Sequence, residues 1–270
     1  MTIKVAMHVH STWSYDGKWP LERLASEFAG RGYQVLLMTE HDQGFSEERR
    51  LAYWEACRKA STERLLIIPG IEYSDPSNTI HILVWGNIPF LGTGRETMEI
   101  LEQATNQGGI CVFAHPSRRK AWQMFRPEWL RHLAGIEIWN RKTDGWSASP
   151  DAIKLIAHTK ASALVGLDFH SPKQFHPLAL LLDLDGSPDE SKVLDALRSG
   201  RYRCHAFGVN VSLFTHPAIN SMTNVVEGAR RLAARSFRFA IANSSSLRSS
   251  FSSRSKRNET NRPPPERVAK

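Results

Sequence analysis

The chain has 270 residues, 41% of them hydrophobic, which is enough to bury a large core in one α/β domain. Its three cysteines are far apart and form no Cys-x-x-Cys pair, which argues against a disulfide framework and a thiolate zinc site and favours a reducing compartment. The net charge of +8 belongs to the C-terminal part: from Gly228 onward eleven Lys and Arg face two acids, a local +9, and the preceding residues carry −1. This near-neutral body lacks the basic stripe expected of a surface that binds nucleic acid.

Apolar strands and helical patterns alternate along the chain. The predicted strands are residues 3–7, 33–38, 65–72, 79–86, 110–114, 135–140, 163–170 and 178–182. The predicted helices between and after them are residues 19–30, 46–62, 96–107, 150–162 and 189–199. Repeated β–helix–β units predict parallel strands with helices outside, in either a barrel or a doubly wound sheet.

Metal-binding residue types lie where these strands end. His8 and His10 close the first strand and share a face, because strand residues two apart point the same way. Such a pair by itself is equally compatible with two hydrogen-bonded histidines. The pattern is repeated, however, at the ends of later strands: His41, Glu72, His115, Asp168 and His170. Because the C-terminal ends of barrel strands meet on one face, the sequence predicts a metal cluster there. His81 begins its strand and needs a hairpin or loop to join the cluster.

These motifs resemble those of the PHP (polymerase and histidinol phosphatase) superfamily of metal-dependent hydrolases. The matching segments, in the family's order, are His8-x-His10 with Asp16, Thr39-Glu40-His41-Asp42, Gly70-Ile71-Glu72, His81, Ala114-His115-Pro116 and Asp168-x-His170. The resemblance implies a distorted (β/α)7 barrel of the PHP type around two or three divalent metal ions. Glu137-Ile138-Trp139-Asn140 resembles the CehA/McbA-like branch of the family.

The resemblance also implies a set of nine residues that are both ligands and catalytic groups. It implies one ion held by His8, His10, Glu72 and Asp168, a second held by Glu72, His81 and His115, and a third held by Asp16, His41 and His170. Six imidazoles and three carboxylates suit Mn, Fe or Zn, and the donor types alone do not choose among these metals. Glu40 stands where many relatives have Asp, and strand alternation predicts that it points away from the face of His41.

Arg118 is the candidate substrate-binding residue, since a guanidinium close to the predicted cluster could neutralise a phosphate with two parallel hydrogen bonds. The alternative is that Arg119 and Lys120 form a solvated turn.

The leading hypothesis is a phosphoesterase in which metal-activated hydroxide attacks the phosphorus of a small phosphorylated metabolite or nucleotide. A nucleic-acid phosphodiesterase or exonuclease is one alternative. A carbamate or amide hydrolase using the same cluster is another, and a third is a non-catalytic, metal-stabilised interaction module.

Beyond His170 the motifs end. We expect a metallohydrolase domain over residues 1–215, a basic helical extension over residues 216–242 and a disordered Ser/Arg/Pro-rich tail over residues 243–270. The basic extension and tail could contact nucleic acid or an anionic membrane. No apolar run nears the ~20 residues of a membrane helix, and no signal-peptide pattern is present, so we expect a cytoplasmic protein.

Overall fold

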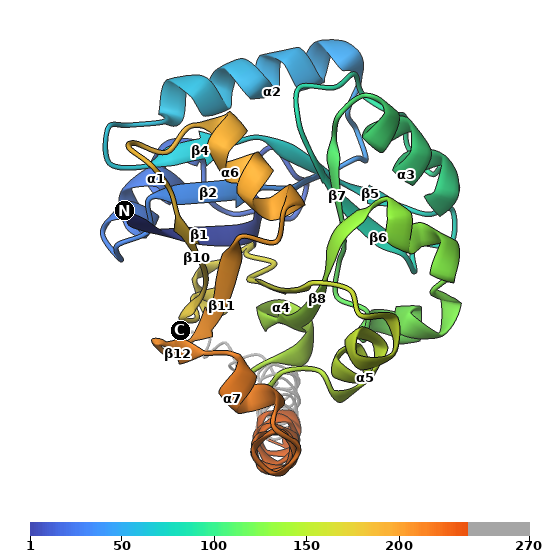
Figure 1. Ribbon diagram of the computed structural model, residues 1–270. Coiled ribbons are helices and arrows are strands. Elements are labelled where there is room, and N and C mark those ends of the chain that lie inside the picture. Colours follow the sequence, from blue (N-terminus) through green and yellow to red (C-terminus); the bar gives the residue numbers. More distant parts are fainter. Residues whose placement is uncertain (237–270) are drawn as a thin grey trace, which may run out of the picture. The chain divides into compact units, whose positions relative to one another are not determined.

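The structure is a computed structural model that describes residues 1–236. Two six-stranded sheets with helices packed on their outer faces form the body of the chain (Figure 1). Both sheets belong to the compact unit Met1–Thr223, and a second unit comprises Asn224–Lys270. The predicted α/β class is confirmed.

The first sheet contains the N-terminal strand at its centre. Its order is β12-β11-β10-β1-β2-β4, with β1 parallel to β2 and antiparallel to β10. The strands are β1 (Thr2–Val9), β2 (Val35–Met38), β4 (Leu66–Ile68), β10 (Leu178–Asp183), β11 (Tyr202–Ala206) and β12 (Val209–Asn210). The central strands are apolar and buried on both faces, as near-continuous hydrophobic runs predict.

The second sheet has the order β3-β5-β6-β7-β8-β9. Its strands are β3 (Glu40–His41), β5 (Gly70–Ser74), β6 (His81–Trp85), β7 (Ile110–Phe113), β8 (Leu133–Asn140) and β9 (Ala163–Gly166). Strand β6 is antiparallel to both β5 and β7, with Ser74 paired to His81. This is the hairpin that His81 needs, because the start of an antiparallel strand lies at the same edge as the end of its neighbour.

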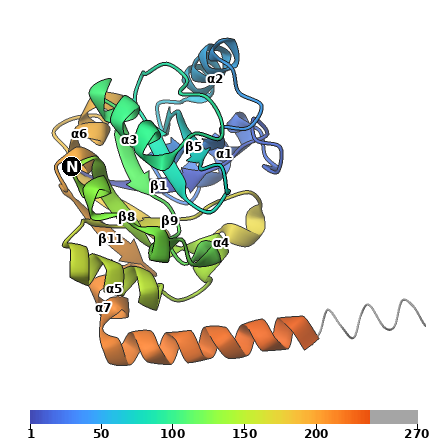
Figure 2. The same ribbon diagram turned by 90° about the vertical axis from the view of Figure 1, so that its right-hand side faces the viewer.

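Helices flank the two sheets. They are α1 (Leu21–Ala29), α2 (Glu47–Ala60), α3 (Thr97–Asn106), α4 (Arg141–Asp144), α5 (Pro150–Thr159), α6 (Glu190–Arg198) and α7 (Ser212–Thr215), with 3-10 helices η1 (Arg118–Met124), η2 (Pro127–Arg131) and η3 (Pro172–Gln174). The side chains of Ser46, Ser149 and Asp189 cap α2, α5 and α6 by accepting backbone N–H bonds. Helix α3 packs on β6 and β7, and α5 packs on β8 (Figure 2).

The expected closed barrel is not confirmed, because the strands within residues 1–236 form two six-stranded sheets rather than one closed ring. The chain passes from the first sheet to the second at Thr39, between β2 and β3, and again at Pro69, between β4 and β5. Proline cannot donate a ladder hydrogen bond, which helps to interrupt the pairing. Elsewhere β1 meets the segment after β9 through an isolated bridge between Val9 and Phe169. Three backbone hydrogen bonds accompany it: from Leu167 to Met7 at 2.9 Å, from Phe169 to His8 at 3.0 Å and from His10 to Phe169 at 2.9 Å.

Several short elements were not predicted. Strand β11 has the polar sequence Tyr-Arg-Cys-His-Ala and is only partly buried, so it lacks an apolar strand signal. Helix α4 has four residues, too few to show a helical period.

Residues 217–236 are helical. The remainder of the predicted extension, residues 237–242, and the predicted disordered tail at residues 243–270 lie outside the described residues. Within residues 1–236, no helix has the length and apolarity required to cross a bilayer.

The end of the first compact unit yields a prediction about truncated chains. Asn220 Nδ2 donates to the carbonyl of Ala148 at 3.0 Å, and Thr223 Oγ1 lies 2.8 Å from Ser147 Oγ. Each such bond contributes about 1 kcal/mol, and 1 kcal/mol corresponds to a shift of about 2–4 °C in Tm for a domain of this size. A chain ending at Thr223 should therefore unfold several degrees above one ending at Thr215 in a calorimetric scan. Equal Tm values would show that residues 216–223 add no stability.

Candidate metal centre

The nine predicted ligands lie together at one edge of the two sheets, although they span residues 8 to 170. They come from the end of β1, the following loop, β3, β5, the start of β6 and the segments after β7 and β9. All nine are buried except Asp16, whose side chain is 35% exposed. Three overlapping groups have ligand atoms close enough to share an ion: His10, His41 and His170; His8, Glu72 and His115; and His8, His10 and Asp168.

Glu72 is the centre of the cluster. Its fully buried carboxylate is surrounded by five imidazoles. Around Oε1 lie His81 Nδ1 at 2.7 Å, His115 Nε2 at 2.9 Å and His8 Nε2 at 3.4 Å, and around Oε2 lie His41 Nδ1 at 3.0 Å and His10 Nε2 at 3.5 Å. Glu72 therefore contacts every imidazole of the cluster except that of His170.

Two aspartates connect His170 to the rest of the cluster. Asp168 Oδ1 lies 3.2 Å from His170 Nδ1 and 3.6 Å from His10 Nε2. Asp16 Oδ2 lies 3.0 Å from His170 Nε2, and its Oδ1 lies 3.3 Å from His41 Nε2. The carboxylates therefore bridge neighbouring imidazoles throughout the site.

The donor atoms fit a metal cluster better than a hydrogen-bond network. Within residues 1–236, His8 Nε2, His10 Nε2 and His115 Nδ1 are buried without a hydrogen-bond partner, which is rare for buried polar atoms. Distances of 3.4–3.7 Å separate His8 Nε2 and His10 Nε2 from the carboxylates. Two atoms each about 2.1 Å from one tetrahedral ion lie roughly 3.4 Å apart. The residues present thus suit divalent metal binding.

Electrostatics act differently on different donors: Glu72 and His10 are held in their binding forms, whereas the pKa values of His8 and His41 are raised by neighbouring carboxylates despite burial. Burial would raise the pKa of Glu72, but His81 and His8 hold it well below its ordinary value. Burial, together with the nearby His170 and His41, lowers the pKa of His10 well below its ordinary value. An ionised carboxylate and a neutral imidazole are the forms that bind metal.

The backbone is strained where it presents three of the ligands. His8, His115 and Asp168 have φ values of 64°, 28° and 47°, in the left-handed region that side chains other than glycine rarely adopt. The β1–β2 register shifts between Met7 and Val9, at the position of His8. Such strain typically accompanies functional sites, where the surrounding structure holds the unusual conformation.

Glu137 supports two of the ligands, and its role was not predicted. Its Oε1 lies 3.0 Å from His8 Nδ1, while Oε2 accepts the His115 backbone N–H at 2.8 Å. Asn140 Nδ2 also donates to Oε2, at 2.9 Å. Gly166 leaves room for this carboxylate, since a Cβ there would lie 1.8 Å from Glu137 Oε1. The sequence signal for this role was Glu137 itself, a charged residue inside an apolar strand, because a buried carboxylate requires a partner.

Glu40 organises the loop that carries Asp16. It accepts hydrogen bonds from the Ser11 backbone at 2.9 Å, from Ser11 Oγ at 2.6 Å and from Ser14 Oγ at 2.5 Å. Ser14 Oγ in turn accepts the His41 backbone N–H at 2.9 Å. Glu40 is thus a structural group behind the ligands.

The cluster opens into a cavity of about 280 Å³ lined in part by Tyr15, Asn78, Arg118 and Lys142. Arg118 donates to the Asn78 carbonyl at 2.8 Å, and its Nη1 lies 3.1 Å from His81 Nε2. The predicted substrate residue therefore lines the cavity beside a ligand. Lys142, which was not predicted, lines the same cavity.

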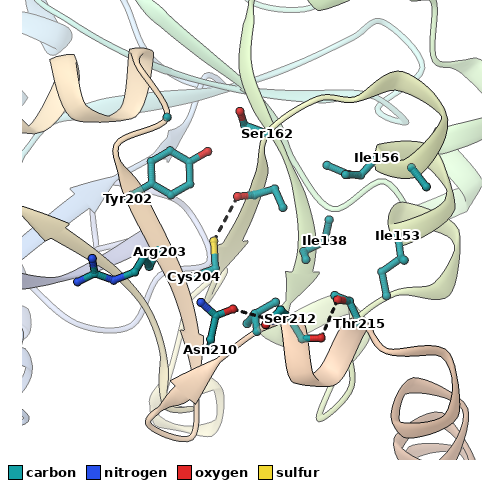
Figure 3. Close-up of a pocket in the computed structure, with 14 residues that line it drawn as sticks. Ile138, Ile153, Ile156, Ser162, Tyr202, Arg203, Cys204, Asn210, Ser212 and Thr215 are labelled. Atoms are coloured by element: carbon teal, nitrogen blue, oxygen red, sulfur yellow. Dashed lines mark hydrogen bonds between the residues drawn. The ribbon is translucent and has the colours of Figure 1, made fainter.

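A larger cavity of about 490 Å³ lies elsewhere, between α5, β8 and β11 (Figure 3). Its walls include Ile138, Ile153 and Ile156, and Cys204 Sγ there donates to the Ala163 carbonyl at 3.2 Å. Ile138 alternates with Glu137 along β8, so it lies on the face of the strand away from the cluster. None of the described residues that line this larger cavity is His, Asp or Glu, so the metal chemistry is assigned to the smaller cavity.

Comparisons with known proteins identify the fold. No protein-family model matches the chain, and no curated protein matches it. A two-domain protein from Bacteroides vulgatus that contains a predicted PHP-like metal-dependent phosphoesterase is similar in structure, with 19% identity and a TM-score of 0.61 over 76% of this chain and 65% of its own. PsfC from Pseudomonas syringae is similar too, with 15% identity and a TM-score of 0.57 over 84% of this chain and 98% of its own.

These similarities confirm the resemblance to PHP-like proteins at the level of the fold. The chain therefore combines a PHP-like fold with a buried His/Glu/Asp cluster suited to divalent metal ions. Assignment to the CehA/McbA-like branch stays a prediction.

The position of Glu137 yields a prediction about metal affinity. Loss of a partner that orients ligands typically weakens metal binding roughly 10–100-fold, so Glu137→Gln should do so by releasing His8 and His115. The measurement is a competition titration against a chromophoric chelator, with the exposed Glu102→Gln as the matched control. Wild-type affinity in Glu137→Gln would show that the ligands are held without this carboxylate.

Proposed function

We propose that this protein is a metal-dependent hydrolase that cleaves a phosphoester of a small phosphorylated metabolite or nucleotide. The carrying observation is the Glu72 carboxylate among five imidazoles at the base of a cavity lined by Arg118. Its structural similarity to the Bacteroides vulgatus protein, which contains a predicted PHP-like metal-dependent phosphoesterase, supports the proposal.

The proposed ligands are the nine clustered residues. Mn, Fe or Zn suits their mixed nitrogen and oxygen donors. Bound ions would supply Lewis acidity and a water molecule with a pKa lowered toward neutrality. The proposed ligand sets are His8, His10, Glu72 and Asp168 for one ion and Glu72, His81 and His115 for a second. Asp16, His41 and His170 are the set that a third ion would use if three ions bind.

Residues of the chain would bind and orient the substrate. Arg118 would direct its guanidinium N–H groups at phosphate oxygens, since a planar guanidinium suits this geometry. Glu137 and Glu40 would keep the ligand-bearing segments in place through the hydrogen bonds described above. The strained conformations of His8, His115 and Asp168 would preorganise the site before substrate arrives.

The size and charge of the site favour a small substrate. A cavity of about 280 Å³ is near the lower end of the range for small-molecule sites. The body before Gly228 has a net charge of −1, whereas nucleic-acid surfaces are typically basic. These observations favour a small substrate over nucleic acid. Nucleic-acid cleavage and carbamate or amide hydrolysis are the alternatives that the experiment must test.

The test is an activity screen of Mn-loaded protein against phosphomonoesters, dinucleotides, single-stranded DNA and aryl carbamates. We expect turnover of a small phosphoester and its loss on treatment with a chelator. His115→Ala, matched to His158→Ala on the outer helix α5, should keep the circular dichroism of wild type. Its turnover should fall by more than the roughly 10–100-fold typical of a supporting partner. Activity on carbamates alone, or wild-type turnover in His115→Ala, would overturn the proposal.

Arg118 yields a separate prediction about substrate affinity. Hydrogen bonds to charged groups contribute about 1.5–3 kcal/mol, so Arg118→Ala should raise KM for a phosphomonoester at least tenfold. Arg119→Ala is the matched control, since Arg119 is exposed and donates to the Asn78 carbonyl at 3.0 Å. Steady-state kinetics of both variants decide the assignment. Equal KM values for the two would place Arg118 in a structural role.

A further inference from the structure

A lysine ammonium lies against the exposed side of the metal centre. Lys142 Nζ is 3.0 Å from His170 Nε2, 3.5 Å from Asp168 Oδ1 and 3.9 Å from Asp16 Oδ2. Its side chain is 38% exposed, and it lines the same cavity as Arg118. The ammonium thus faces two of the three carboxylates among the proposed ligands.

The segment that carries Lys142 is held at both ends. Asn140 Oδ1 caps α4 by accepting the Thr143 backbone N–H at 3.0 Å, and Asp144 Oδ2 accepts the Asn140 backbone N–H at 2.7 Å. Ser117 Oγ also donates to Asp144. A tethered cation has a high effective concentration beside these carboxylates, whereas a free ion must be captured from solution.

The ammonium occupies space that a third ion would share. An ion bound to His170 Nε2 at about 2.1 Å would lie no more than roughly 5 Å from Lys142 Nζ, because the two distances add. At that separation a divalent ion and an ammonium repel each other because both are positively charged, and they would compete for the Asp16 carboxylate. Asp16 is also the most exposed of the nine ligands, which makes this side of the cluster the weakest place to hold an ion.

We propose that the Lys142 ammonium takes the place of one metal ion beside Asp16, Asp168 and His170 and so excludes that ion from the cluster. This inference rests on the proposed metal-dependent function. The cluster then holds two ions, through the ligand sets that include Glu72. On this side the cavity receives a fixed positive charge and N–H donors in place of a Lewis acid. Lys142 is therefore a positioning residue that determines the metal content of the site.

The test counts ions rather than turnover. Full-length protein is stripped with a chelator, equilibrated by dialysis against Mn²⁺, and analysed for manganese per chain. We expect two ions in wild type and in Lys142→Arg, which keeps the charge, and three in Lys142→Met and Lys142→Gln. Lys192→Met is the matched control, since Lys192 pairs with Asp189 at 3.2 Å on α6, outside the site. Circular dichroism verifies that each variant is folded, and two neutral variants guard against a failure of one to fold.

The outcomes separate the two proposals. One additional ion in the neutral variants, with no change in Lys142→Arg and Lys192→Met, supports the role of Lys142. Equal counts in wild type and the neutral variants, or three ions in wild type, overturn it while leaving the metal-dependent function intact. Absence of manganese from every variant and from wild type overturns both the metal-dependent function and the role of Lys142.

Discussion

The structure of the site depends on one buried carboxylate among imidazoles. Glu72 is removed from water, which is costly for a charge unless partners compensate for lost hydration. Five histidines from β1, β3, β6 and the segment after β7 provide that compensation, and in doing so they tie strands of both sheets together. The same contacts leave several ring nitrogens without hydrogen-bond partners among the described residues. Hydrogen bonds within the cluster therefore leave several buried nitrogen atoms unpaired, whereas metal ions would use these atoms as ligands.

The departures from regular sheet geometry serve this cluster. Pairing is interrupted near Thr39 and Pro69, and the backbone has positive φ at His8, His115 and Asp168. A regular strand would direct its last side chains alternately to opposite faces. The strained positions instead bring ligands from successive strands toward one carboxylate. The gap in sheet pairing and the metal centre thus have a common structural origin at the strand ends.

Charge is arranged differently on the two sides of the cavity. On the His8 and His115 side, the additional carboxylate of Glu137 holds ligands from behind. On the Asp16 side, the ammonium of Lys142 faces the carboxylates directly, and Arg118 lines the same cavity. An anionic substrate would therefore meet two fixed positive charges at the surface of a site whose depth is rich in carboxylate. This arrangement is consistent with the proposed phosphorylated substrate, whose charge would be offset as it leaves water.

The sequence alone determined the identity and order of the nine clustered residues. Seven are imidazoles or carboxylates at strand ends, which is a local signal, His81 stands at the start of its strand, and Asp16 was included through the resemblance to PHP motifs. For His81 the sequence left a hairpin and a loop open, and the structure shows the antiparallel hairpin of β5 and β6. Only the tertiary structure decided that Glu72 is the central group, that Glu137 holds His8 and His115, and that Lys142 faces Asp16 and Asp168. These contacts join residues far apart in the chain and depend on strained backbone and broken strand pairing, neither of which has a periodic sequence signal. The residue types that can bind a metal are visible in the sequence, whereas the positions of charges around the site are set only when distant segments pack together.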